Sequence, residues 1–324
     1  EPEIPGISVG HNGYGAWELT VFRTDAEDLY VYNLNPNNPS EYLYNGKWKK
    51  FEVIKEKINV KGKGEKEVSL NYSIHGPVTF IDKKRNKAYA VKCGWLEVGG
   101  SPYLASLRMD QSKSWEEFRD ACNYSNIPGE NMVWADKDGN IGWQAVGIAP
   151  LRNTHSGLVP VMGNGEYEWD GYLPIIEKPN KFNPKENFIQ TANQNVTPDD
   201  YDRWNAIGFD WADPFRGNRI NNILTNSSNF SMEDMISLQV DYHSVSSEKL
   251  IMMLSNILND DNKYFKILSN WDNILSKESI AAGLYNMWEM TIWSEFNRRY
   301  VPKEVKGLIW MQLSRVIEKL ENFS

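Results

Sequence analysis

The chain has 324 residues, 41% of them hydrophobic and 24% charged, which is ordinary for a globular protein with one large or two smaller domains. Its net charge of −8 argues against nucleic-acid binding, which would require a basic face. The two cysteines, Cys93 and Cys122, match neither a disulfide framework nor a metal motif. No apolar run approaches the roughly 18 residues of a membrane span, and the first ten residues do not resemble a signal peptide.

The segment Gly10–Tyr30 is the most informative stretch near the start of the chain. Glycines on both sides of His11 and Asn12 predict a tight turn. The residues Ala16–Phe22 are rich in strand formers and predict a strand buried on much of both faces. Three carboxylates follow it within four residues, Asp25, Glu27 and Asp28. This cluster is either a solvated loop or an oxygen-ligand site for a hard cation such as calcium.

The pattern from residue 28 to residue 100 is that of β-strands, and from Ser101 it changes to a helix followed by further strands. Two strands near 50–60 and 66–74 flank a glycine-lysine turn and predict a hairpin. Ser114 is positioned to cap a helix that runs through Ala121. The strands 132–135 and 141–149 predict a second hairpin around the turn 136–140.

Residues 150–218 form a long irregular region rich in glycine, proline and aromatic residues, which is typical of functional or wrapping loops. Near its end, the residues 188–193 predict a short buried strand with Asn193 at its exposed end. The later part of the chain is predicted to be helical at 219–225, 231–239, 246–258, 264–271, 280–300 and 305–321. We therefore expect a β-rich portion, residues 1–218, and a helical segment, residues 219–324.

The residues themselves indicate no obvious nucleophile. None of the four histidines forms a zinc-binding pattern, and no nucleophile elbow or P-loop is present. Two alternatives use the 13 tryptophans. One is a carbohydrate-active protein with Asp136 and Asp138 as its paired carboxylates, and the other is an extracellular ligand-binding module without chemistry.

Several motifs in order resemble the penicillin acylase (penicillin amidase) family of N-terminal-nucleophile hydrolases. The first is PG-x-x-x-GHN-G-x-x-x-W-x-x-T from Pro5 to Thr20, followed by D-x-x-D-L-Y from Asp25 to Tyr30. The others are YNGKW at 44–48, HGPV at 75–78, WADKDGNIGW at 134–143, EWDGYLP at 168–174, FIQTANQ at 188–194 and FRGNRI at 215–220.

The resemblance implies an α+β fold, with a β-rich part of an αββα sandwich followed by a helical segment. In this family the nucleophile is a serine at the start of the β chain, freed by autocatalytic processing, and its α-amino group is the base. That serine precedes the GHN motif by some tens of residues, so its strand is expected to be missing here. The chain is then an internal portion of an acylase β chain that hydrolyses a linear amide only together with the α chain and the rest of the β chain. Family members are typically exported, which implies a periplasmic or extracellular location.

The resemblance also assigns site residues. Asn193 falls on the asparagine that donates to the oxyanion, and Val21 falls on the residue whose backbone N–H is the second donor. Arg216 matches an arginine near the amino end of the nucleophile. Val9 and Leu19 fall on acyl-pocket positions, where an ordinary core role is the alternative. Arg23 stands where phenylacetyl-specific members carry an aromatic residue, so other acyl groups, including acyl-homoserine lactones, remain open.

The family's calcium ion is bound by an aspartate, a backbone carbonyl two residues on and the next aspartate. Asp25, the carbonyl of Glu27 and Asp28 have that spacing. A further aspartate is expected after the TAN motif, where three candidates are present: Asp199, Asp200 and Asp202.

Overall fold

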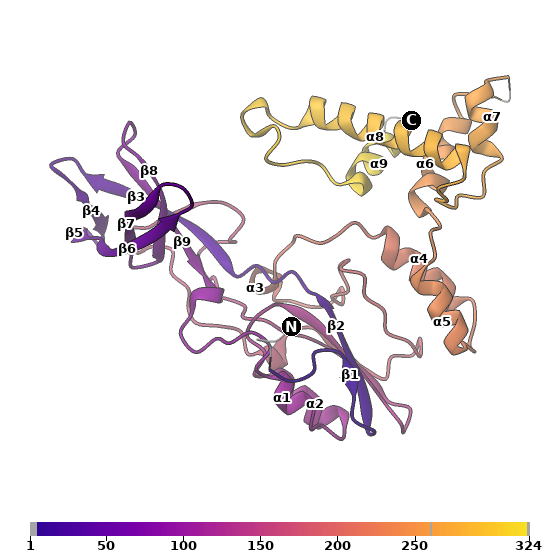
Figure 1. The fold of residues 1–324 in the computed structure, drawn as a ribbon, viewed down its shortest axis with the longest axis horizontal. Helices are drawn as coiled ribbons and strands as arrows, with labels where there is room; N and C mark the ends of the chain where they lie inside the picture. The colour runs from indigo at the N-terminus through magenta and orange to yellow at the C-terminus, as the bar shows by residue number, and fades with distance from the viewer. Residues whose placement is uncertain (1–4, 260, 323–324) are drawn as a thin grey trace. The chain divides into compact units, whose positions relative to one another are not determined.

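A computed structural model describes residues 5–259 and 261–322. The chain divides into two compact units (Figure 1). Unit 1 comprises Glu1–Ile189 and Thr197–Asp210, and unit 2 comprises Gln190–Val196 and Trp211–Ser324. The segment that holds Asn193 thus belongs to the unit that contains the helices after residue 211, although the residues directly before and after it in sequence belong to unit 1.

Unit 1 contains a five-stranded antiparallel sheet in the order β1-β2-β10-β11-β13. Its strands are β1 (Gly10–His11), β2 (Gly15–Val21), β10 (Glu130–Asp136), β11 (Ile141–Ala145) and β13 (Asn180–Phe182). β10 is central: Trp134 pairs with Trp17 of β2 on one side and with Gly142 of β11 on the other. The predicted hairpin around residues 136–140 is confirmed, since Ala135 pairs with Ile141.

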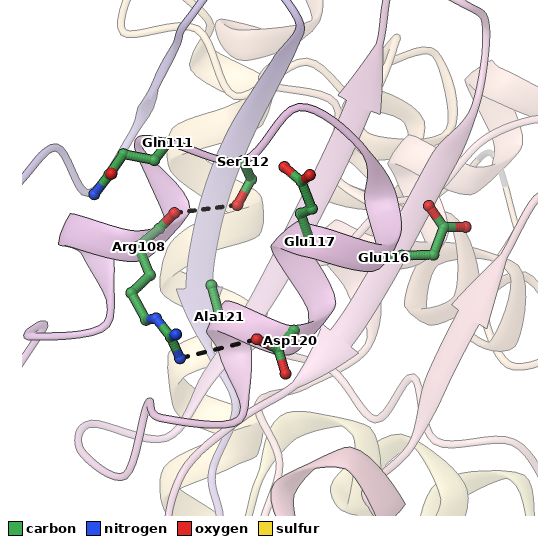
Figure 2. Close-up of a pocket in the computed structure, with 7 residues that line it drawn as sticks. All are labelled: Arg108, Gln111, Ser112, Glu116, Glu117, Asp120 and Ala121. Carbon is green, nitrogen blue, oxygen red and sulfur yellow. Dashed lines mark hydrogen bonds and ion pairs between the residues drawn. The ribbon is translucent and has the colours of Figure 1, made fainter.

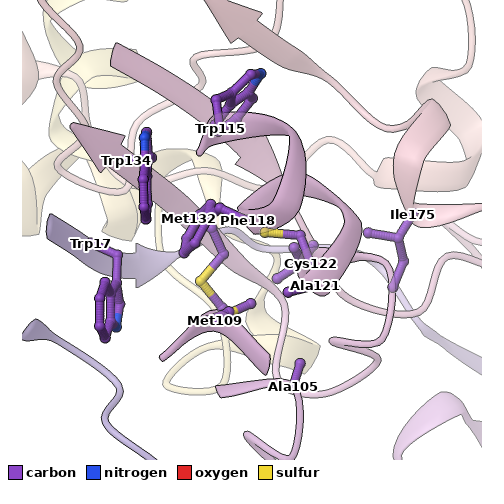
Figure 3. Close-up of a cluster of buried hydrophobic side chains, with 11 residues drawn as sticks. Trp17, Ala105, Met109, Trp115, Phe118, Ala121, Cys122, Met132, Trp134 and Ile175 are labelled. Atoms are coloured by element: carbon purple, nitrogen blue, oxygen red, sulfur yellow. The ribbon is translucent and has the colours of Figure 1, made fainter. Parts of the chain in front are cut away.

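One face of this sheet is covered by two short helices, α1 (Ser106–Met109) and α2 (Trp115–Cys122) (Figure 1). Figure 3 shows their shared core, in which Trp17, Met132 and Trp134 of the strands meet Phe118 of α2. The Ser114 cap is confirmed, because its side chain accepts from the backbone N–H of Glu117. The expectation that β2 is buried on both faces is wrong, since its alternate residues Ala16 and Glu18 are exposed.

The second sheet of unit 1 has eight strands. Seven are antiparallel in the order β5-β4-β3-β9-β8-β7-β6, and β12 pairs in parallel with β3. Their bounds are β3 (Glu27–Asn35), β4 (Asn38–Tyr44), β5 (Lys47–Lys50), β6 (Glu52–Val60), β7 (Gly64–Ser73), β8 (Gly76–Asp82), β9 (Lys87–Cys93) and β12 (Val161–Met162). A 3₁₀ turn, η1 (Gly94–Leu96), follows β9. β3 alternates buried and partly exposed residues, so one face carries an aromatic core of Tyr30 and Tyr32.

Two of the sequence motifs meet in this aromatic core. His75 of the HGPV motif is buried, stacks on Tyr30 at 3.7 Å between ring centroids and hydrogen-bonds the Tyr32 hydroxyl. Its Nε2 lies 2.9 Å from Oε2 of Glu168 in the EWDGYLP motif. Burial lowers the pKa of His75, against the opposing effect of Glu168. These motif residues therefore fasten a long loop onto the sheet.

β6 and β7 form an exposed hairpin arm. Nearly every residue of β6 is exposed, and the two strands pair from Glu52–Tyr72 to Val60–Gly64. Cross-strand ion pairs join Lys55 to Glu67 at 3.3 Å and Lys57 to Glu65 at 2.8 Å. The predicted turn at its tip is confirmed, with Gly62 and Gly64 at positive φ.

The irregular region contains two further short elements, η2 (Ile175–Glu177) and α3 (Trp204–Ile207). The predicted strand at 188–193 is wrong, since these residues form no strand. Asn193 has φ of 67°, which ends an extended run. The side chain of Gln194 accepts from the backbone N–H of Ala192 at 2.7 Å, so a side chain takes the place of a sheet partner.

Unit 2 contains α4 (Phe215–Thr225), α5 (Met232–Gln239), α6 (Val245–Ser255), α7 (Lys263–Ser269), α8 (Ile280–Tyr300), η3 (Lys303–Val305) and α9 (Leu313–Glu321). α5 begins with a capping box between Ser231 and Asp234. The helix predicted over 305–321 is wrong in its first part, because Gly307 has φ of 84° and α9 begins only at Leu313. Within residues 5–259 and 261–322, no helix has both the length and the apolar character needed to cross a bilayer.

Candidate active site

Asn12 organises the turn before β2. Its Nδ2 donates to the carbonyls of Asp110 at 3.1 Å and Ser112 at 2.6 Å. Its Oδ1 accepts from the backbone N–H groups of Tyr14 and Gly15. One side chain thus closes the β1–β2 turn and fixes it to the loop after α1, which explains an asparagine between two glycines.

The end of β2 is held by a buried amide that the sequence did not reveal. Asn131 of β10 donates to Oγ1 of Thr20 at 3.1 Å and to the carbonyl of Val21 at 3.3 Å. Its own Oδ1 accepts from Nε1 of Trp143 at 2.8 Å. The backbone at Val21 is therefore fixed from the neighbouring strand.

The three residues expected at an acyl pocket lie close to this end of the sheet. Leu19 of β2 is half-buried and packs against the core under α1 and α2. Val9 is exposed and directly precedes β1. Arg23, just beyond β2, donates from Nη1 to Oδ2 of Asp210 at 3.0 Å, and both side chains are exposed.

The carboxylate cluster after β2 surrounds a buried arginine. Arg152 has a fully buried side chain, and its Nε donates to Oδ2 of Asp28 at 2.9 Å. Its Nη2 contacts the carbonyls of Asp25 and Glu27 at 3.1 and 3.3 Å. Burial raises the pKa of Asp25, and the guanidinium opposes that effect. A lone arginine in an irregular region carries no sequence pattern, so it was missed.

Asp28 is the most constrained member of the cluster. Its Oδ2 accepts from Arg152, from Nε2 of His155 at 3.1 Å and from Nε1 of Trp169. Its Oδ1 is buried and has no hydrogen-bond partner among the described residues. Asp25, Glu27, Asp28 and Pro160 also line a hollow of about 350 Å³.

These residues fit a calcium ion in one respect. An orphaned, buried carboxylate oxygen is costly unless a cation or a donor reaches it. The described part of the chain shows no convergence of three or more His, Cys, Asp or Glu side chains, so backbone carbonyls would have to complete the ligand set. The side chain of Glu27 accepts instead from Sγ of Cys93, which leaves only its carbonyl for the cluster.

The aspartates expected to add a further ligand lie elsewhere. Asp199, Asp200 and Asp202 are exposed, and Asp202 lies 4.0 Å from Arg203. What this segment contributes to the cluster is the carbonyl of Asn205, which accepts from Nη1 of Arg152 at 3.1 Å.

In unit 2, Arg216 and Asn193 are in direct contact. Nη2 of Arg216, on the first turn of α4, donates to Oδ1 of Asn193 at 2.9 Å and to the carbonyl of Ala192 at 2.8 Å. The carbonyl of Asn193 accepts from the backbone N–H of Ala212 at 3.0 Å. Because Oδ1 is turned toward the guanidinium, the amide nitrogen points away from it.

Gly217 allows α4 to approach this loop. A Cβ at position 217 would lie 2.4 Å from the side-chain amide of Gln194, which is buried. Ala192 and Arg216 line a hollow of about 400 Å³ in unit 2 together with Phe215, Arg219, Asp241 and His243. Arg219 donates to Asp241 at 2.8 Å and does not contact Asn193 in any bond that the structure shows.

The carboxylates proposed for glycoside chemistry have a structural role. Oδ1 of Asp136 accepts from the backbone N–H groups of Asp138 at 3.0 Å and Asn140 at 2.9 Å, which closes the β10–β11 turn. Burial would raise the pKa of Asp136, but the hydrogen bonds from Asn140, Trp134 and Asp138 outweigh it and lower the pKa. A carboxylate of this kind is a poor general acid.

A third hollow, of about 450 Å³, lies between α1 and α2 (Figure 2). Arg108 and Asp120 face each other across it at 3.8 Å, and Oγ of Ser112 donates to the Arg108 carbonyl. None of its lining residues belongs to the acylase motifs.

The family model for penicillin amidase matches residues 1–323, which is nearly the whole chain. The chain belongs to the penicillin amidase family. Among its relatives are penicillin G acylase of Escherichia coli, 31% identical over 222 residues, and acyl-homoserine lactone acylase QuiP of Pseudomonas aeruginosa, 29% identical over 266 residues. These matches cover 68% and 78% of this chain, but only 26% and 31% of the relatives. This penicillin amidase family chain therefore spans about a quarter to a third of these relatives.

A solved structure gives the same result for the fold. The thermostable penicillin G acylase of Alcaligenes faecalis matches with a TM-score of 0.82 and 25% identity, over 95% of this chain and 58% of that one. The mixed helix-and-sheet architecture expected from the motifs is thus confirmed as that of a penicillin amidase. The structure shows what several of the family's motif residues do: Asn12 closes a turn, His75 and Glu168 fasten a loop, and Arg216 holds Asn193.

Proposed function

We propose that the protein to which this chain belongs hydrolyses a linear amide into a carboxylic acid and an amine. The observation that supports this most strongly is the contact between Arg216 and Asn193. A side-chain amide whose oxygen is engaged by a guanidinium presents its N–H₂ group as a donor. Amide hydrolysis needs such donors, because its tetrahedral intermediate carries a negatively charged oxygen.

In the proposed mechanism the nucleophile is the N-terminal serine of a processed chain, in a part of the protein outside the present sequence. Its hydroxyl oxygen attacks the amide carbonyl carbon while its α-amino group takes the proton. The backbone N–H of Val21 and the side-chain amide of Asn193 are proposed to donate to the oxyanion. The α-ammonium group then gives this proton to the amide nitrogen, so that the intermediate expels a neutral amine and leaves an acyl ester, which water hydrolyses to the carboxylic acid and the free serine hydroxyl. The present portion alone is accordingly inactive.

The acyl group is proposed to contact Leu19 and Val9. The relatives are named for penicillin G and for acyl-homoserine lactones, so the substrates in their names carry different acyl groups. Arg23 is charged, exposed and paired with Asp210. It does not offer the aromatic surface that a phenylacetyl group would need at this position, and we do not expect a phenylacetyl preference.

We further propose that calcium binds at the carboxylate cluster and has a structural role. Asp25, the Glu27 carbonyl and Oδ1 of Asp28 would hold it, and the buried, unpaired state of that oxygen supports the proposal. Bound there, calcium would neutralise charge that Arg152 alone leaves uncompensated. From the family resemblance we also propose an exported, autoprocessed precursor.

The deciding experiment uses the full-length protein produced in its host. N-terminal sequencing of each mature chain should find one that starts with serine and precedes this sequence. A panel of acyl 4-nitroanilides should then release 4-nitroaniline. An unprocessed protein that cleaves none of these amides would overturn the proposal.

A further inference from the structure

Glu130 is a buried carboxyl group for which the proposed mechanism has no use. It is the first residue of β10 and only 2% exposed. Its Oε1 accepts from the hydroxyl of Tyr103 at 3.4 Å, which is a long hydrogen bond. Its Oε2 is buried and has no hydrogen-bond partner in the described part of the chain. A buried polar atom without a partner destabilises the fold, so its presence calls for an explanation.

The strand register places this carboxyl beside the residues proposed to bind the substrate. Glu130 pairs with Val21, and Met132 pairs with Leu19 two positions on. Residues directly opposite in an antiparallel pair project from the same face, with Cβ atoms about 5 Å apart. Glu130, Val21 and Leu19 therefore share one face of the sheet, and Val21 is about half exposed there.

The surroundings of Glu130 are otherwise apolar. Met132 belongs to the hydrophobic core of this face and Leu19 packs against it, and among the described residues the hydrogen bond from Tyr103 is the only one to the Glu130 side chain. Burial raises the pKa of Glu130 to about 7, and the Tyr103 hydrogen bond opposes this only in part. Neither a cation nor a strong donor therefore compensates this carboxyl from within the described chain.

We propose that Glu130 is a specificity-determining residue of the acyl site, and that the preferred acyl group carries an amino or hydroxyl group within the first few carbons from its carbonyl. This inference rests on the proposed function, because Val21 defines where the substrate carbonyl lies. A hydrogen-bond donor on the acyl chain would donate to Oε2 of Glu130, which has no partner among the described residues. A plain alkyl chain would leave that oxygen buried without a partner. A site built to bind a hydrogen-bond donor strongly disfavours a substrate that lacks this donor.

The test compares three 4-nitroanilides on the full-length protein: butanoyl, 3-hydroxybutanoyl and 3-aminobutanoyl. The wild-type protein should favour one or both of the substituted acyl groups over butanoyl by at least about tenfold in kcat/KM. The arm with the larger kcat/KM identifies whether a neutral or a cationic donor is selected.

Two variants make the result specific to Glu130. Glu130→Leu should remove the preference and raise kcat/KM for butanoyl, and that gain also shows that the variant folds. Glu130→Gln keeps an oxygen acceptor but no charge, so it should retain a hydroxyl preference and lose an amino preference. Val133→Ala, a change at a residue that pairs with Glu18 on the other face of the strand, should leave the ratios unchanged.

The outcomes separate this inference from the proposed function. A wild-type protein that prefers butanoyl, or ratios that are equal in wild type and Glu130→Leu, would overturn the role of Glu130 while amide hydrolysis stands. If Glu130→Leu does not fold, Glu130→Met takes its place, and substrate ratios equal to those of the wild type in that variant would overturn the role of Glu130. Failure to hydrolyse any amide would overturn the proposed function itself.

Discussion

Arg216 and Asn193 are joined through the side-chain oxygen of the asparagine, at 2.9 Å. The same nitrogen of Arg216 also reaches the Ala192 carbonyl at 2.8 Å, so the guanidinium fixes both the backbone and the side chain of this loop. Asn193 adopts a left-handed backbone conformation, which asparagine tolerates better than most residues. Both its identity and its orientation are thus determined locally.

The first prediction concerns this pair. In the full-length protein, Asn193→Ala should lower kcat for amide hydrolysis by about 10²–10³, because one oxyanion donor is lost. Arg216→Met should give a smaller loss, since the amide remains but can rotate. Arg219→Met is the control, because Arg219 lies about one helical turn after Arg216 and pairs with Asp241. This variant should lower the melting temperature and leave kcat nearly unchanged. Equal kcat losses in all three variants would contradict an oxyanion role.

A second prediction concerns the pH dependence of stability at Glu130. Its pKa is raised from 4.5 to about 7 in the folded protein. Between these two values the unfolded state loses the proton first, so the wild type loses stability as pH rises. Glu130→Gln should therefore gain stability over wild type between pH 4.5 and 7, by up to about 3 kcal/mol, and the difference should level off above pH 7. Melting temperatures of both proteins over this range measure the effect, and a difference independent of pH would refute it.

The third prediction concerns Lys178, which is fully buried and donates from Nζ to Thr24 Oγ1, the Val146 carbonyl and the Gly147 carbonyl at 2.6, 2.7 and 2.9 Å. Burial lowers its pKa well below 10.5. As pH falls from 10.5, the unfolded state takes up the proton first, so the stability that this lysine contributes decreases.

Lys178→Met should therefore destabilise the protein most near pH 10, because it removes the lysine donor from the buried carbonyls of Val146 and Gly147. The destabilisation should shrink as pH falls toward 7. Lys181→Met, at an exposed position of β13, is the matched control and should change the melting temperature little at either pH. A larger effect at pH 7 than at pH 10 would rule out this explanation.

A fourth prediction tests calcium at the carboxylate cluster. Removal of calcium with a chelator should lower the melting temperature of the full-length protein, and added calcium should restore it. Asp28→Asn should abolish this response, because Oδ1 of Asp28 is the proposed ligand. Glu27→Gln should retain it, because position 27 is proposed to contribute only its carbonyl. A melting temperature that does not change on chelation would contradict the calcium proposal, and Arg152 would then be the cation that balances these carboxylates.

The fifth prediction compares two glycines by the space around them. A Cβ at position 15 would lie 2.1 Å from the ring of Trp134, so Gly15→Ala should destabilise unit 1 by several degrees in melting temperature. Gly283 is the fourth residue of α8 and has open space around it, so Gly283→Ala should be neutral or stabilising by about 0.5–1 kcal/mol. Equal effects would contradict the packing described for Trp134.

The sequence was most informative where local rules decide the structure. The Ser114 and Ser231 caps, the β10–β11 turn and the full extent of α8 were predictable, because capping, turn chemistry and helical periodicity act within a few residues. The strand predicted at 188–193 was wrong because Gln194 satisfies the backbone of Ala192 with its own side chain. The sequence pattern alone cannot show that a side chain replaces a neighbouring strand as the hydrogen-bond partner.

Long-range contacts of single residues were not predictable. Arg152 binds Asp28, which lies 124 positions earlier in the sequence, and Glu130 of β10 pairs with Val21 of the neighbouring strand β2. Neither Arg152 nor Glu130 belongs to a repeating sequence pattern that would have indicated its partner. The assignments of Val21, Asn193 and Arg216 came from the family resemblance. The contact between the last two is a structural observation, and their roles in catalysis stay predictions.

The exposed arm of β6 and β7 has a practical consequence. At its tip, a Cβ added to Gly62 or Gly64 would meet no atom within 4 Å, and the pairing of the arm is internal up to Val60 and Gly64. Exposed loop tips of this kind accept insertions with little cost. The tip between Val60 and Gly64 is therefore a suitable point for attaching a fluorophore or an affinity tag, because none of the proposed substrate-binding or metal-binding residues lies on the arm.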